Sequence, residues 1–154
     1  MAQEIERKFL VQGDAWRKGA ERVLIRQGYL SADGARTVRV RIKGERAFVT
    51  IKGPPAALVR AEYEYEIPIA DADEMLHHLC MKPLIEKWRY FVPFAGVMWE
   101  VDEFLNENAG LVVAELELHD AAQQVQLPAW VAQEVTSDLR YTNANLAKRP
   151  FATW

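Results

Sequence analysis

The sequence predicts an α+β fold that is mainly β, in which eight antiparallel strands close into a barrel with a few flanking helices. Three observations predict it. Eight segments alternate between apolar and polar residues, as strands do, and Gly, Pro, Asn or Asp residues separate them. Most of these segments carry charges on one face and apolar residues on the other. Eight strands are also enough to enclose a small ligand and to remove exposed strand edges.

The expected strands follow one another along the chain, separated by short turn segments. Their ranges are 3–11, 21–31, 36–43, 46–53, 59–69, 84–94, 97–104 and 111–119. Periodicity alone does not distinguish a closed tunnel from an open sheet with one solvated face, so both remain possible from alternation.

Helices are expected in two places. Between the fifth and sixth strands, Asp71 and Glu74 form a capping-box pattern and Pro83 would end a helix of about ten residues. Its buried face would carry Met75, Leu76, Leu79 and Cys80. After His119 the alternation stops, and residues 128–135 and 143–148 are expected to form two short helices.

Size, charge and cysteine content limit the possible functions. A chain of 154 residues is expected to form a single domain, residues 1–154, and its net charge of −3 argues against a nucleic-acid partner. Cys80 is the only cysteine, so it forms no intrachain disulfide. The charged start lacks the apolar region of a signal peptide, and the longest apolar run, residues 91–99, is too short to span a membrane. These features predict a cytoplasmic protein without a membrane partner.

The charges on the polar faces are sorted by sign, strand by strand. Like charges on neighbouring positions repel, so a solvated sheet face normally mixes them. Carboxylates in groups suit a hard divalent ion, whereas Arg and Lys suit phosphate oxygens. The pattern therefore predicts a metal-bound polyphosphate between an acidic and a basic wall. The acidic positions are Glu4, Glu6, Glu62, Glu64, Glu66, Glu100, Asp102, Glu115 and Glu117, and the basic ones are Lys8, Arg39, Arg41, Lys43, Lys52, Lys87 and Arg89.

Several ordered motifs resemble the triphosphate tunnel metalloenzymes, the superfamily with the CYTH domain. The N-terminal Glu-x-Glu-x-Lys signature matches residues 4–8. The later blocks that match are 27–30, 38–41, 50–53, 62–64, 86–90, 99–104, 110–111 and 114–118. The tail motifs at 134–136 and 140–143 resemble the small bacterial members. Trp88, Asn106 and Ala132 depart from the pattern, but no charged motif position is missing.

The resemblance implies an eight-stranded tunnel that hydrolyses or cyclises triphosphates with Mg²⁺ or Mn²⁺. It implies metal ligands among Glu4, Glu6, Glu62, Glu64, Asp102, Glu115 and Glu117, and triphosphate binding by Lys8, Arg39, Arg41, Lys52, Lys87 and Arg89. Lys8 and Lys87 are the catalytic candidates, as groups that stabilise the transferred or leaving oxygens. The sequence does not assign a general base.

The favoured function is a metal-dependent triphosphatase that converts inorganic tripolyphosphate into pyrophosphate and phosphate, with nucleoside triphosphates as further substrates. The alternatives are a thiamine triphosphatase or adenylate cyclase on the same scaffold, or a module that binds polyphosphate without catalysis. Such a protein is expected to work as a monomer or a homodimer on a small-molecule substrate. No role in the site is expected for His77, His78 or Cys80, and Tyr29 either contacts phosphate or fills space.

Overall fold

The computed structural model describes residues 3–54 and 59–154. Nine strands and two α-helices make up most of it, joined by short 3-10 helices. The strands are β1 (Gln3–Val11), β2 (Glu21–Ala32), β3 (Thr37–Lys43), β4 (Arg46–Lys52), β5 (Val59–Ile67), β6 (Ile85–Phe94), β7 (Val97–Phe104), β8 (Val112–Glu117) and β9 (Val131–Glu134), and the helices are α1 (Ile69–His78) and α2 (Asn143–Lys148). All eight expected strands are present, within two residues of their expected ends.

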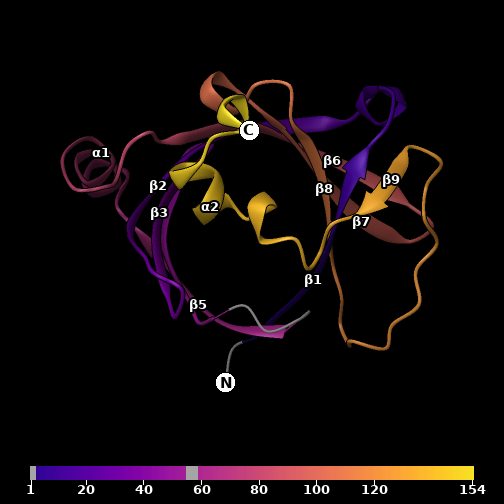
Figure 1. Ribbon diagram of the computed structural model, residues 1–154, viewed down its shortest axis with the longest axis horizontal. Helices are drawn as coiled ribbons and strands as arrows, with labels where there is room; N and C mark the ends of the chain where they lie inside the picture. Colours follow the sequence, from indigo (N-terminus) through magenta and orange to yellow (C-terminus); the bar gives the residue numbers. More distant parts are fainter. Residues whose placement is uncertain (1–2, 55–58) are drawn as a thin grey trace.

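The eight expected strands close into an antiparallel barrel (Figure 1). The sheet order is β5-β4-β3-β2-β6-β7-β8-β1, and β1 pairs back to β5, with Glu4 opposite Arg60. The extra strand, β9, attaches to β1 beyond this closure, with Val11 opposite Val131. The prediction of a closed barrel is therefore confirmed, and the open sheet is ruled out.

Two of the three apolar clusters pack on the outside of the barrel, and the third fills one end of it. Trp99 and Phe9 belong to a buried cluster on the outer face of β1, β6, β7 and β8. Leu76 of α1 packs with Val40 and Ala47 over β3 and β4. A third cluster, which includes Leu146 of α2, packs the C-terminal helix at one end of the barrel, where Figure 1 shows it across the opening. The rest of the lumen is lined mostly by polar and charged side chains.

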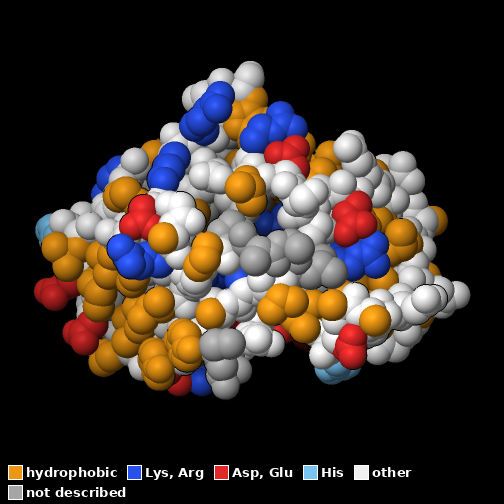
Figure 2. Space-filling model, turned by 60° about the horizontal axis from the view of Figure 1, so that its bottom comes forward, with side chains coloured by type: hydrophobic (Ala, Val, Ile, Leu, Met, Phe, Trp, Pro, Cys, Tyr) orange, Lys and Arg blue, Asp and Glu red, His pale blue; other side chains and the backbone are white. Residues whose placement is uncertain are grey.

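Part of the outer face of β4 and β5 is exposed. Ile51, Tyr63 and Tyr65 project outward from these strands and are 39 to 59% exposed. Figure 2 shows hydrophobic side chains gathered on this lower side of the molecule. The apolar alternation in this region therefore reflects a partly solvated barrel exterior instead of a packed core.

The helix predicted at residues 128–135 is wrong. Residues Val131–Glu134 form β9, and the backbone around them bonds to β1: Gln12 N donates to Trp130 O at 2.9 Å and Val135 N donates to Lys8 O at 2.8 Å. The second edge of β1 supplies unpaired backbone groups beyond its contact with β5, and satisfying them outweighs local helix preference. The short helix predicted at 143–148 is confirmed as α2.

The helix α1 is confirmed, but its start and buried face differ from the prediction. It begins at Ile69 after Pro68, with no side-chain cap, so Asp71 is not its N-cap. Leu79 follows the last helical residue and is 67% exposed, whereas Cys80 is buried as expected. Within the described ranges, the structure contains no helix long and apolar enough to cross a membrane.

Candidate functional site: a charged tunnel

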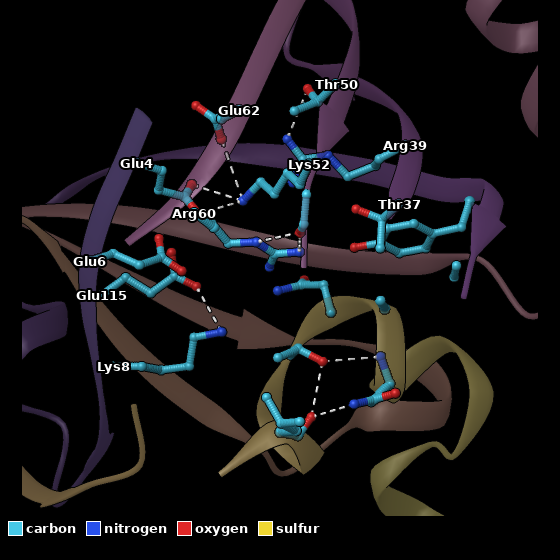
Figure 3. Close-up of a pocket in the computed structure, with 18 of the residues that line it drawn as sticks. Glu4, Glu6, Lys8, Thr37, Arg39, Thr50, Lys52, Arg60, Glu62 and Glu115 are labelled. Carbon is cyan, nitrogen blue, oxygen red and sulfur yellow. Dashed lines mark hydrogen bonds and ion pairs between the residues drawn. The ribbon is translucent and has the colours of Figure 1, made fainter. Parts of the chain in front are cut away.

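A cavity of about 550 Å³ occupies the barrel lumen (Figure 3), with α2 at one end. All eight barrel strands contribute lining side chains, although β6 contributes only Arg89 and β7 only Glu100. Its charged lining residues are Glu4, Glu6, Lys8, Asp33, Arg36, Arg39, Arg41, Lys43, Lys52, Arg60, Glu62, Glu64, Arg89, Glu100, Glu115, Glu117 and Lys148. Alternation along the strands explains this convergence, because residues two apart share the inward face.

On the acidic wall, Lys52 bridges two carboxylates. Its Nζ lies 2.8 Å from Glu4 Oε2 and 3.4 Å from Glu62 Oε2, and Figure 3 shows the ammonium between them. The closure of the barrel produces this contact, because Lys52 and Glu62 are opposed on β4 and β5 and Glu4 lies on the adjoining β1. Burial raises the pKa of Glu4, and the nearby Glu62 adds to this, whereas Lys52 opposes it.

Glu6 lies in the same acidic region. Burial, together with the negative charges of Glu115 and Glu4, raises the pKa of Glu6 to about 7. Burial and neighbouring negative charge thus favour a proton on Glu6 near neutral pH, and a divalent cation in place of that proton would relieve the repulsion.

Lys8 connects the acidic wall to the C-terminal segment. Its Nζ lies 3.6 Å from Glu115 Oε1, across the β1 and β8 pairing, and donates to Tyr141 O at 3.3 Å. Burial opposes its charge, but Glu115 and Glu6 raise the pKa of Lys8 overall. Burial likewise opposes ionisation of Glu115, yet Lys8 and Arg89 hold the pKa of that carboxyl at about 2. Both groups are therefore charged.

The basic wall carries guanidinium groups with unused donors. Arg39 Nη2 donates to Thr50 Oγ1 at 3.2 Å and lies 3.6 Å from Glu64, while its buried Nε has no hydrogen-bond partner among the described residues. Arg41 Nε donates to Gln27 Oε1 at 2.7 Å. Burial, with the charges of Arg39 and Arg89, lowers the pKa of Arg41 to about 9. This excess of positive charge is suited to an anion.

Asp102 lies behind the basic wall, not among the acidic side chains. Arg89 reaches it with two bonds, Nε to Oδ1 at 2.8 Å and Nη2 to Oδ2 at 2.9 Å, and Lys87 Nζ lies 2.7 Å from Oδ2. Asp102 and Lys87 are 1% and 0% exposed, and neither lines the cavity. These two predicted site residues therefore lie behind Arg89, which lines the cavity, and Asp102 holds the Arg89 guanidinium in place.

The acidic positions supply pairs of carboxylates rather than a ready coordination sphere. Among residues 3–54 and 59–154, no three acidic, His or Cys side chains gather as a metal site. Lysine ammonium groups neutralise these carboxylates instead. Lys52 lies between Glu4 and Glu62, and Lys8 lies beside Glu115. The oxygen donors and the raised pKa of Glu6 fit a hard divalent ion, which would displace these lysines from the carboxylates.

Several lining residues were not assigned to the site by sequence reasoning. Arg60 shares the inward face of β5 with Glu62, so alternation was a sufficient signal for it. Asn143 and the fully buried Gln27 contact the basic groups, but only the folded C-terminal segment brings them together. Tyr29 lines the cavity, and His119 lines a second cavity with Glu100 and Glu117. His77 and His78 lie on the surface.

Comparisons with known proteins agree with this architecture. The chain is 51% identical to an inorganic triphosphatase of Acetivibrio thermocellus over 151 residues, which are 98% of this chain and 97% of that protein. It is 38% identical to an inorganic triphosphatase of Nitrosomonas europaea over 152 residues, covering 94% and 96% of the two chains.

Solved structures show the same fold. The crystal structure of the inorganic triphosphatase NE1496 superimposes with a TM-score of 0.68 at 36% identity, covering 96% of this chain and 95% of that one. The PH1012 protein of Pyrococcus horikoshii, with a TM-score of 0.58 at 20% identity over 77% of this chain and 80% of that one, shares the fold alone. The model of the CYTH domain matches residues 2–151, and the chain belongs to the CYTH family.

Proposed function

We propose that this protein is a metal-dependent inorganic triphosphatase, which hydrolyses tripolyphosphate to pyrophosphate and phosphate. The observation that carries the proposal is the enclosed cavity in which a wall of carboxylates faces a wall of guanidinium groups. The names of the two relatives, both inorganic triphosphatases that match over nearly their whole length, support the same activity.

The phosphate chain would lie against Arg39, Arg41 and Arg89. All three line the cavity, and Arg39 keeps a buried Nε without a partner among the described residues. Guanidinium groups match non-bridging phosphate oxygens in bidentate geometry. Arg89 is held in place by Asp102, so little ordering is required when the ligand binds. Lys8 and Lys52 complete the anion site from the acidic side.

The acidic wall would hold the divalent ion. Glu4, Glu6, Glu62 and Glu115 line the cavity and are the ligands that we propose, with Glu64 and Glu117 at its more exposed positions. Asp102 is occupied by Lys87 and Arg89, and we propose that it serves them instead. When bound, Mg²⁺ or Mn²⁺ supplies neutralisation of phosphate charge and a Lewis acid for the leaving oxygen.

Hydrolysis requires a water oxygen to attack the terminal phosphorus as the bridging P–O bond breaks. The electron pair of that bond passes to the pyrophosphate oxygen, and the attacking water loses a proton. Lys8 lines the cavity, and we propose that its charge stabilises the leaving oxygen while the arginines stabilise the equatorial oxygens of the transferred group. A lining carboxylate that is not bound to metal would orient the water and accept its proton.

A substrate panel tests the proposal. Phosphate release is measured from tripolyphosphate, ATP, GTP and thiamine triphosphate, each with Mg²⁺ or Mn²⁺, and products are separated by chromatography. Tripolyphosphate is expected to turn over fastest. Preference for thiamine triphosphate, or formation of cyclic AMP from ATP, would assign one of the alternative enzymes. Binding without turnover of any compound would leave a polyphosphate-binding module.

The setting of the activity is part of the proposal. The substrate is a small molecule, and one CYTH domain over residues 1–154 would carry the reaction as a monomer or homodimer. The single cysteine supports a reducing compartment, so we place the protein in the cytoplasm.

A further inference from the structure

Asn143, in the tail motif, lies where the C-terminal segment meets the basic wall. It is the first residue of α2, follows the N-cap Thr142, and lines the cavity. Its Oδ1 accepts hydrogen bonds from Lys87 Nζ at 2.9 Å and from Gln27 Nε2 at 3.1 Å. The docking of α2 through Leu146, which is fully buried, fixes this position.

These two donors determine how the carboxamide of Asn143 is turned. An ammonium group only donates, so the amide atom next to Lys87 must be the oxygen. Gln27 is oriented independently, because its Oε1 accepts from Arg41 Nε and leaves its own Nε2 to face Asn143. The Nδ2 of Asn143 is therefore directed away from both, and it donates to no other residue in the described ranges.

We propose that Asn143 is a further substrate-binding residue, whose Nδ2 donates to a non-bridging oxygen of the triphosphate. The inference rests on the proposed function and adds a neutral donor to its phosphate site. Lys87, which does not line the cavity, orients this donor from behind. The Asn143 amide is thus ordered before the ligand arrives, and the hydrogen bond needs no rearrangement.

A neutral donor suits this point of the wall for an electrostatic reason. Burial, with the charges of Arg89 and Arg41, lowers the pKa of Lys87, and burial, with the charges of Arg39 and Arg89, lowers that of Arg41. A further cation would increase the repulsion among these cations, whereas an amide supplies an N–H without charge. A carboxylate there would satisfy Lys87 but would face the phosphate with a negative oxygen.

The substitution Asn143→Asp separates the two roles of this side chain. It keeps the shape and the acceptor for Lys87 but removes the N–H donor. We expect the KM for tripolyphosphate to rise about ten- to hundredfold, with a smaller change in kcat, because a hydrogen bond to a charged ligand is lost and a repulsion is gained. Asn143→Ala is expected to raise KM by less, because it loses the donor without adding charge.

Asn145→Asp is the matched control, since it places the same charge change in the same helix. The Nδ2 of Asn145 already donates to Leu139 O at 2.7 Å, so no free donor is removed. The proposal is overturned if Asn143→Asp binds tripolyphosphate as tightly as wild type while Asn143→Ala binds it more weakly, which would show that Asn143 only holds Lys87. Equal KM changes in Asn143→Asp and Asn145→Asp would overturn it too.

Calorimetric titration measures the binding of tripolyphosphate separately from its hydrolysis. It therefore keeps this inference distinct from the proposed function. A wild-type protein that binds tripolyphosphate but does not hydrolyse it would end the proposed function, while weaker binding by Asn143→Asp would still support Asn143 as a ligand-binding residue. A wild-type protein that does not bind would overturn both. Thermal melting checks each variant, and Asn143→Ala carries the comparison if Asn143→Asp does not fold.

Discussion

Lys52 Nζ lies 2.8 Å from Glu4 Oε2, across the closure of the barrel. The same ammonium is 3.4 Å from Glu62. This lysine thus neutralises carboxylates in the position where a divalent ion is expected, and it is also a candidate phosphate ligand. We therefore expect metal binding to release Lys52 from Glu4, so that the ammonium can turn to the phosphate.

The competition between Lys52 and metal is tested by Lys52→Met. We expect the affinity for Mn²⁺ alone to increase about three- to tenfold, because the carboxylates lose an internal cation. The KM for tripolyphosphate is expected to rise, because a phosphate ligand is lost. Calorimetry with Mn²⁺ and steady-state kinetics measure the two effects. Lys43→Met is the control, since Lys43 lines the cavity without an ion pair to any described carboxylate; an equal gain in Mn²⁺ affinity there would contradict the explanation.

Glu6 is expected to reduce the stability of the metal-free protein at neutral and higher pH. Its pKa in the fold is about 7, above the ordinary 4.5, so the folded state binds this proton more tightly than the unfolded state does. Stability contributed by the protonated carboxyl is present below pH 4.5 and is lost as the pH rises through 7. At pH 8 the unfolding free energy of Glu6→Gln should therefore exceed that of wild type by up to about 3 kcal/mol, so the variant should unfold at a higher urea concentration. At pH 4.5 this gain in stability should be absent.

Activity should change in the opposite direction in the same variant. Glu6→Gln removes a proposed metal ligand, so metal-dependent phosphate release is expected to disappear although the protein is more stable. Urea unfolding at both pH values and phosphate release at pH 8 provide the comparison. Loss of the fold in Glu6→Gln would show that this carboxylate packs instead of binding metal.

Asp102 is expected to be the carboxylate on which the fold depends most. It is 1% exposed and compensates both Lys87 and Arg89, which together keep its pKa well below the usual range despite its burial. Asp102→Asn leaves two buried cations with reduced compensation and should cost roughly 3–5 kcal/mol of unfolding free energy.

The neighbouring Glu103 provides the control for Asp102. It points to the outer face and pairs with Arg17 at 2.8 Å, with both side chains partly exposed. Glu103→Gln should cost no more than about 1 kcal/mol, because solvent screens the pair. Urea denaturation of the two variants at pH 7 gives the comparison, and similar losses would mean that burial does not determine the strength of these interactions.

The alternation in the sequence was sufficient to predict the barrel strands and their inward charges. Successive strand residues face opposite ways, so the inward position of Glu4, Arg39 and Glu115 follows from local pattern alone. The outward Tyr65 follows the same pattern but is exposed, since the sequence does not tell which outer faces the helices cover.

The parts that could not be predicted depend on contacts between distant segments. Residues 128–135 have a helical pattern in isolation, but the unpaired edge of β1 makes them a strand. The approach of Asn143 to Lys87 depends on where α2 docks, whereas Asp102 meets Arg89 because the register of β6 and β7 opposes them. Alternation identifies the face on which a side chain lies, but it does not identify its nearest partner.

Removal of metal is expected to stop catalysis without unfolding the protein. The apolar clusters lie on the outside of the barrel or at the end closed by α2, and in the lumen Lys52 and Lys8 already compensate Glu4 and Glu115 without any metal. A protein treated with EDTA should therefore keep a cooperative melting transition while phosphate release ceases.

Adding Mn²⁺ back at one hundred times its dissociation constant should stabilise the fold by about 2.7 kcal/mol, or roughly 5 °C or more in Tm. Glu6→Gln should show little of this increase, since it lacks a proposed ligand. If EDTA abolishes the melting transition instead, the lumen carboxylates need metal to fold, and the compensation by Lys52 and Lys8 is insufficient.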